Sequence, residues 1–271
     1  MLAIDGSTLD FKRLDRLALQ NTVIHRIDAR VKVVTTIVFI ICVVSFDRYT
    51  IAAMLPFLSF PIVLSVLGNL PPGYLLRKLL LVIPFALAIG LFNPLFDRQV
   101  VLRFGELNVW GGWVSCASIL LRAILTASTA IILVAVTGFP AICAALQKLG
   151  MPQVFAIQLQ FLYRYIFVLT DEAVRVARSR QLRSFGRRGL GLHQFGSLIG
   201  HLLLRTWERA ERIHMAMLSR GFQGEFQATW GKGRLGRDDL FFISGWSALF
   251  VFFRFYNLPQ FLGNLMTWRI P

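Results

Sequence analysis

The sequence predicts an all-α polytopic membrane protein with about five transmembrane helices and a cytoplasmic insertion of further helices. Two observations predict this class. Of the 271 residues, 56% are hydrophobic and only 16% are charged, which is too apolar a composition for an ordinary soluble domain. Several apolar runs also approach the length of about 20 residues with which a helix crosses roughly 30 Å of hydrocarbon.

Five apolar runs are the predicted transmembrane helices, at residues 33–46, 51–70, 79–96, 115–139 and 240–253. The first and last are short for a full crossing, so both are expected to extend into flanking residues. A sixth candidate at residues 154–169 carries Gln158, Gln160 and Arg164, which favours a helix that lies at the membrane surface or leads out of it. The number of crossings stays open between five and six.

Charge placement predicts the orientation. The 29 lysines and arginines exceed the 14 acidic residues, and they gather at residues 12–32, 77–78 and above all 175–237. The positive-inside rule makes these segments cytoplasmic, whereas residues 97–113 balance their charges and can face outward. Because most of the basic residues lie in these segments, we expect them to set topology and to form a docking surface, with no nucleic acid as a partner.

Four domains follow from this topology: a cytoplasmic N-terminal segment (1–32), a four-span membrane region (33–151), a cytoplasmic helical region (152–239) and a last transmembrane helix with its tail (240–271). Charged residues near the start leave no room for the apolar core of a secretory signal, so the N-terminus is expected in the cytoplasm. Arg254 and Arg269 leave the side of the C-terminus open. We expect a multi-pass protein embedded in the lipid bilayer of the cell (inner) membrane.

The cytoplasmic region contains two predicted helices. The second, at residues 202–220, has an apolar stripe on one side and pairs Glu208 with Arg212 on the other. The stripe consists of Leu203, Trp207, Ala210, Ile213 and Met217. The first helix continues to about Arg183 and turns polar after Asp171. Gly186 and Gly221 are expected to end the two helices, since glycine adopts the left-handed conformation of a helix C-terminus.

The two helices end on nearly the same sequence, RSFG at 183–186 and RGFQG at 220–224. A cation in the last helical turn interacts favourably with the helix dipole, by about 0.3 to 1 kcal/mol, which is sufficient to explain either arginine alone. The repetition of the pattern on two helices indicates two similar receiving surfaces, such as the halves of a dimer.

Three stretches resemble a known family: NTVIHRIDARVKVVTTIVF, FLYRYIFVLTDEAVRVARSRQLRSFG and RTWERAERIHMAMLSRGFQG. They resemble the transmembrane (T) component of energy-coupling-factor (ECF) transporters, in the cobalt-type (CbiQ-like) family, over residues 20–225. This resemblance implies that the insertion holds two coupling helices. Each helix would end in an Ala-Arg-Gly or similar triplet that seats in a groove of one ATPase subunit.

The resemblance also implies which residues couple. The second triplet is Ser219, Arg220 and Gly221, with serine in place of the usual alanine. The first is Leu182, Arg183 and Ser184, chosen because Arg183 ends the helix. The stretch 177–179, which contains Arg178, is a competing match and stays open. The implied partners are two copies of the ATPase subunit and a substrate-specific, metal-binding membrane subunit.

No catalytic, cofactor or metal site is expected in this chain. The glycines and lysine at 231–233 lack the rest of a phosphate-binding loop, so ATP hydrolysis is expected on separate subunits. The four histidines are scattered, and His214 is expected to pack or hydrogen-bond on its helix. The three cysteines lack metal-type spacing and read as small core residues.

The sequence and the resemblance together predict a non-catalytic scaffold of an ATP-driven importer, for cobalt or nickel ions. An alternative is the T component of a vitamin importer. A stand-alone secondary transporter is a further alternative, but such a protein is expected to place acidic groups at mid-membrane, and the five runs hold no Asp or Glu. The one charge well inside a run, Arg122, is expected to hydrogen-bond between helices.

Overall fold

The computed structural model describes residues 14–47, 50–96, 100–104, 107–183, 192–222 and 236–255. Contacts divide the chain into two units. The bundle unit comprises Arg16–Gly138 and Gly231–Pro271, and the arm unit comprises Met1–Asp15 and Phe139–Trp230. Apart from one two-stranded hairpin, the elements within the described residues are helices, which confirms the predicted helical class.

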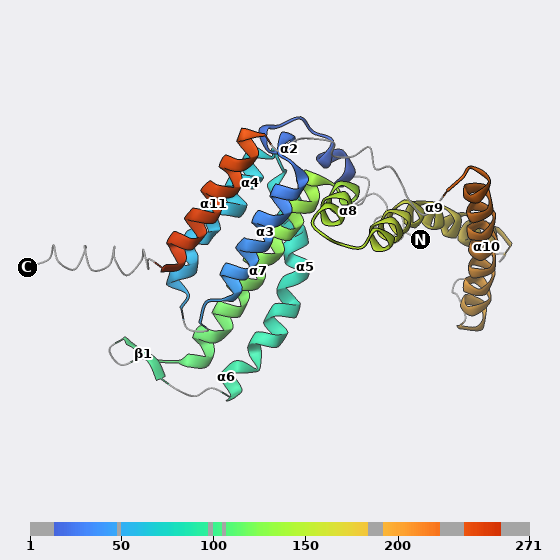
Figure 1. The fold of residues 1–271 in the computed structure, drawn as a ribbon. Coiled ribbons are helices and arrows are strands. Elements are labelled where there is room, and N and C mark those ends of the chain that lie inside the picture. Colours follow the sequence, from blue (N-terminus) through green and yellow to red (C-terminus); the bar gives the residue numbers. More distant parts are fainter. Residues whose placement is uncertain are drawn as a thin grey trace, which may run out of the picture. The chain divides into compact units, whose positions relative to one another are not determined.

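The bundle unit is built from α2 (Val23–Arg26), α3 (Ala29–Val44), the 3₁₀ helix η1 (Ala52–Leu58), α4 (Ser59–Leu67), α5 (Pro72–Leu91), α6 (Asn93–Phe96), α7 (Gly111–Thr137) and α11 (Arg237–Phe255). Along the chain, α3, η1 with α4, α5, α7 and α11 run alternately in opposite directions (Figure 1). The most extensive contacts join α5 to α7 and α3 to α11. As a result, the first and last long helices of the unit are parallel neighbours.

Phenylalanine rings form the core between α3, η1, α4 and α11. Phe39, Phe57, Phe60 and Phe250 are almost completely buried. The Phe39 and Phe60 ring centroids are 4.9 Å apart, and Phe60 and Phe250 meet edge to face at 5.0 Å. Edge-to-face pairs are favourable because the positive rim of one ring meets the negative face of the other. These rings therefore hold α11 against segments that precede it by about two hundred residues in the sequence.

Two helices of the described part, α5 and α7, are long and apolar enough to cross a membrane. The start predicted for α5, residue 79, is wrong. The helix begins at Pro72, and it ends at Leu91 before the predicted residue 96. Proline suits the first helical turn, and Arg77 and Lys78 interrupt the apolar run without interrupting the helix. The predicted number of crossings remains a prediction.

The run predicted as one helix at 51–70 is interrupted. It consists of the 3₁₀ helix η1, which contains Pro56, followed directly by α4. Proline cannot donate to the preceding turn and its ring clashes with the carbonyl four residues earlier, so an unbroken α-helix is disfavoured here. The two pieces extend for about 27 Å in total at about 2.0 and 1.5 Å per residue, which still approaches the hydrocarbon thickness.

The segment between α6 and α7, predicted as an outward-facing loop at 97–113, contains secondary structure. Strands β1 (Val100–Phe104) and β2 (Leu107–Trp110) pair antiparallel, with Arg103 opposite Asn108. Their sequences are rich in valine and aromatic residues, which favour extended backbone. The charge balance that predicted an outward orientation for this segment carried no information about this pairing.

The arm unit consists of α8 (Phe139–Lys148), α9 (Gln153–Arg183) and α10 (Leu192–Ser219). The sixth candidate for a crossing lies within α9, which is not among the membrane-length apolar helices of the described residues. The start predicted for α10, residue 202, is wrong, because the helix begins at Leu192. Gly196 and Gly200 in this first part lower its helix propensity and concealed it.

Candidate functional site

The described part of helix α9 extends to Arg183, the residue predicted to end the first coupling helix, and Arg183 is exposed. Leu182 beside it is also exposed, at 77%. Ser184, the third residue of the predicted triplet, and Gly186 lie outside the described residues. Arg178 is exposed one and a half turns earlier, so each arginine is accessible to a partner.

Helix α10 ends in a Schellman motif that includes the second predicted triplet. Gly221 has a φ of +76°, and its N–H donates to the carbonyl of Leu218 at 2.9 Å. The N–H of Phe222 donates to the carbonyl of Met217 at 3.0 Å. Both bonds are diagnostic of this helix ending, which confirms the predicted stop at Gly221. The motif leaves the Arg220 side chain exposed at the tip of the helix.

The apolar surface of α10 is wider than the predicted stripe. Ile213 and Met217 are half-buried, whereas Trp207 is 74% exposed and Leu203 is 66% exposed. Further exposed apolar side chains on this helix are Ile199, Leu204, Met215 and Leu218. An exposed apolar surface of this extent on a helix typically marks an interaction site or a membrane contact.

An ionic cluster joins α9 to α10, and sequence reasoning missed it. The Glu172 carboxylate accepts hydrogen bonds from Arg175 at 2.6 Å and from Arg205 of α10 at 2.8 Å. The hydrogen bond from Arg175 and the charges of Arg175, Arg205 and Arg209 lower the pKa of Glu172. The predicted pair of Glu208 with Arg212 is also present, at 3.8 Å within α10.

The first half of α9 is held within the arm unit by Tyr163. Its hydroxyl donates to the carboxylate of Asp15, and its ring stacks on Phe139 of α8 with centroids 4.9 Å apart. Burial and the hydrogen bond to Asp15 raise the pKa of Tyr163. The hydroxyl therefore remains a donor at every physiological pH.

Two arginines bind the C-terminal end of α3 in the bundle unit. Arg122 of α7 donates to the carbonyls of Phe46 at 2.8 Å and Asp47 at 2.7 Å. The predicted hydrogen bonding of Arg122 is present, but its acceptors lie in the turn that follows α3 and not in another helix. Arg254 of α11 donates to the Ser45 carbonyl at 3.0 Å. Cations at this position complement the negative end of the helix dipole and satisfy carbonyls that lack partners within the helix.

The opposite ends of α3 and α11 are joined by Asp239. One carboxylate oxygen accepts from the N–H of Asp28, which precedes α3, and the other accepts from the N–H of Gly236, which precedes α11, both at 2.8 Å. A single buried carboxylate thus caps the N-termini of two parallel helices. The buried Lys32 lies near both acidic groups and balances their charge.

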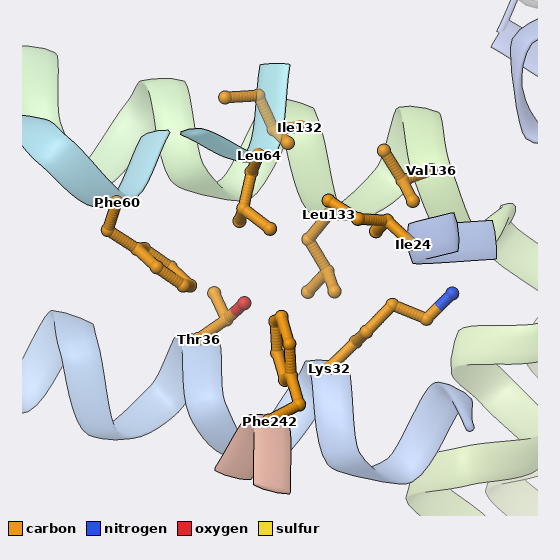
Figure 2. A pocket seen from close by; sticks show the side chains of 9 residues that line it. All are labelled: Ile24, Lys32, Thr36, Phe60, Leu64, Ile132, Leu133, Val136 and Phe242. Carbon is orange, nitrogen blue, oxygen red and sulfur yellow. The ribbon is translucent and has the colours of Figure 1, made fainter. Parts of the chain in front are cut away.

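Lys32 also borders a small, mostly apolar cavity (Figure 2). The Lys32 side-chain nitrogen points away from Thr36 and Phe242, which also line the cavity. Among the residues that the structure describes, the cavity walls carry no set of carboxylate, imidazole or thiol groups that could hold an ion. The lining residues are Ile24, Lys32, Thr36, Phe60, Leu64, Ile132, Leu133, Val136 and Phe242.

The histidines and cysteines lie apart in the described part of the chain, which contains no group of three or more potential metal ligands. His25 bonds Thr22 at 2.7 Å and the Leu17 carbonyl at 2.9 Å, which gives it a structural role before α3. His214 is exposed on α10, and Cys116 and Cys143 are buried. The side chain of His193 lies outside the described residues.

The chain is similar to several known proteins. A family model described as "Cobalt transport protein" (CbiQ) matches residues 20–230. An uncharacterized protein of Methanocaldococcus jannaschii is 28% identical over 75% of this chain and 73% of its own length. The EcfT transmembrane protein of an energy-coupling factor transporter from Thermosediminibacter oceani is 24% identical, over 75% of this chain and 82% of its own. The cobalt transport protein CbiQ of Salmonella typhimurium is 26% identical over 53% of this chain and 69% of its own.

Proposed function

Because the chain belongs to the cobalt transport protein family, whose model matches residues 20–230, we propose that it is the transmembrane (T) component of an ECF-type importer of cobalt. The chain is a membrane protein of this family, and relatives that match it are named CbiQ and EcfT. The observation that carries the proposal beyond family membership is the exposed Arg220 at the ordered tip of α10.

In this proposal the arm unit couples the bundle unit to two ATPase subunits. Arg183 and Arg220 each seat in a groove of one subunit, where the planar guanidinium offers a fork of donors to a carboxylate or to backbone carbonyls. ATP-driven closure of the two subunits moves the two helix ends, and α9 and α10 transmit that motion as rigid bodies. A substrate-specific membrane subunit holds the metal ion, and this chain scaffolds it.

The chain itself is proposed to catalyse no step and to bind no cofactor. ATP hydrolysis belongs to the separate ATPase subunits, since the sequence has no phosphate-binding loop of the G-x-x-x-x-G-K-[ST] type. Reconstitution tests this division of labour. Liposomes that contain this chain alone should import no cobalt, whereas liposomes with all three kinds of subunit should import it when ATP is supplied. Uptake by the chain alone would support a secondary transporter instead.

Replacement of the two arginines tests the docking role. If they only neutralise helix dipoles, Arg183→Ala or Arg220→Ala should cost about 1 kcal/mol or less. If they seat in grooves, each substitution strands a partner group in a desolvated interface and should cost about 2 to 5 kcal/mol of binding. We expect the double variant to lose co-purification with the ATPase subunits while it remains folded in the membrane.

Arg178→Ala is the matched control for the first triplet, because Arg178 is a similarly exposed arginine on the same helix. A severe defect from this control would move the first docking site one and a half turns upstream. Normal assembly and full uptake of the double variant would reject the docking role.

A vitamin is the second candidate cargo. The relatives named EcfT are named for the type of transporter and not for a metal ion, so their names leave the cargo open. Since this chain is not expected to hold the cargo, the substrate-specific subunit decides between cobalt, nickel and a vitamin. Purification of the intact complex and identification of that subunit by mass spectrometry distinguishes them. A metal-binding membrane subunit would support the proposal, and a vitamin binder would replace its cargo.

A further inference from the structure

The two helices of the arm unit that bear Arg183 and Arg220 touch over a small area, and their charged contact is concentrated at Glu172. Among the described residues, the bond from Arg205 to Glu172 is the one ion pair between α9 and α10. Glu172 also holds Arg175 on its own helix, and Arg209 contributes to the positive surroundings. Two arginines, one from each helix, thus bond one carboxylate, and a third adds to its positive surroundings.

The cluster lies far from the helix ends that bear Arg183 and Arg220, so a small change of angle at the cluster displaces those ends by a larger distance. Arg183 lies about 16 Å beyond Glu172 on α9, and Arg220 lies about 22 Å beyond Arg205 on α10, since a helix rises about 1.5 Å per residue. Neither stretch contains glycine or proline, so neither has an evident point of bending. A tilt of about 10° at the cluster would therefore displace Arg220 by about 4 Å, which is enough to miss a groove.

An isolated ion pair at the surface contributes little to stability, but a network of several charges is the exception. The Glu172 side chain is 19% exposed, whereas its partners Arg175 and Arg205 are 67% and 66% exposed. A half-buried acceptor with one donor from each helix restricts the angle between the two helices, because the bond to each of its two oxygens adds a directional constraint.

We propose that Glu172 is a positioning residue that fixes the angle between the two coupling helices, so that Arg183 and Arg220 meet both ATPase subunits at once. The role in transport rests on the proposed function, whereas the role in the helix angle does not. Glu172→Gln keeps the size of the side chain and removes the charge that attracts the three arginines.

Spin labels test the angle in the full-length chain. Labels at Ser179 of α9 and Ala216 of α10, both exposed, are introduced after Cys42, Cys116 and Cys143 have been replaced by alanine. We expect a broader distance distribution in Glu172→Gln than in the parent. Glu208→Gln is the matched control, since it removes a carboxylate that pairs within α10 alone, and it should leave the distribution unchanged.

A charge swap separates the ion pair from other effects of the substitution. Glu172→Arg combined with Arg205→Glu restores an opposite pair between the helices, and the distribution should narrow again. A distribution in Glu172→Gln as narrow as in the parent, or a swap variant as broad as Glu172→Gln, would overturn the positioning role.

Reconstituted complexes give the functional readout. Glu172→Gln should still co-purify with the ATPase subunits, but cobalt uptake per ATP hydrolysed should fall at least about fivefold, the lower limit of common coupling energies. Unchanged uptake per ATP would overturn the transport part of the proposal. Failure of the docking proposal is distinguishable, because it appears as normal assembly of the Arg183 and Arg220 double variant and leaves the spin-label result intact.

Discussion

Gly221 allows α10 to end where it does. Its φ of +76° lies in the left-handed region, where residues with a Cβ are sterically strained and glycine is not. A Cβ at this position would meet nothing within 4 Å, so the cost of Gly221→Ala comes from the backbone alone. A non-glycine residue in this region costs about 1 to 2 kcal/mol. We expect the amides of residues 217–222 to exchange hydrogen about 5- to 30-fold faster, measured by mass spectrometry.

Gly196→Ala is the matched control for Gly221→Ala. A Cβ added at Gly196 would also meet open space, but this residue lies inside α10. Alanine is favoured over glycine by about 0.5 to 1 kcal/mol within a helix, so exchange near residue 196 should slow. If Gly221→Ala also slowed exchange, the Schellman ending would not be what holds the tip of α10.

At the residue scale, the sequence was informative where a residue acts through its own helix. The pattern of glycine after arginine predicted the ending at Gly221, and Glu208 and Arg212 paired because their spacing guarantees proximity. Glu172 was missed because its partner Arg205 is distant in sequence. Helix periodicity does not encode how two helices cross, so a bond of this kind becomes visible only in the fold.

At the scale of the elements, the contact between α5 and α7 depends on a glycine. A Cβ on Gly90 would lie 2.9 Å from the Sγ of Cys116 and 3.6 Å from its Cα. We expect Gly90→Ala to destabilise the protein by about 1 to 3 kcal/mol through overpacking, measured as a lower midpoint of thermal unfolding in detergent.

Cys116→Ala supplies the test of that explanation. It removes the sulfur that the added methyl group would strike, so the double variant should recover part of the stability lost in Gly90→Ala. Simple addition of the two losses would show that the tight Gly90 contact is not the cause.

The limits of the predicted elements also have physical causes. The ends of α7 and α11 follow the apolar runs closely, because neither helix contains a proline that would interrupt it. Pro56 accounts for the break at η1, and α5 begins at Pro72 although Arg77 and Lys78 interrupt its apolar run. Composition alone hides such features, since it averages over the residues that start, bend or stop a helix.

For the whole molecule, the parallel packing of α3 and α11 constrains the topology. Asp239 joins their N-terminal ends and Arg254 joins their C-terminal ends, so both helices begin on the same side of the bundle unit (Figure 1). If both cross the membrane, residue 28 and residue 236 lie on one side, and the residues near Asp47 lie on the other. The sequence could not have predicted this pairing, because nothing in either run specifies its neighbour.

Cysteine labelling in intact cells tests this topology together with the predicted orientation. In a background without the three native cysteines, we expect a membrane-impermeant reagent to label Asp47→Cys from outside, because residue 47 is exposed at the far end of α3. Asp238→Cys, exposed at the start of α11, should react only after the membrane is permeabilised, since the basic segments are expected in the cytoplasm. Labelling of both positions from outside would contradict the parallel crossing of α3 and α11. Labelling of position 238 alone would keep the parallel crossing and reverse the orientation, and would move the coupling helices away from any cytoplasmic ATPase.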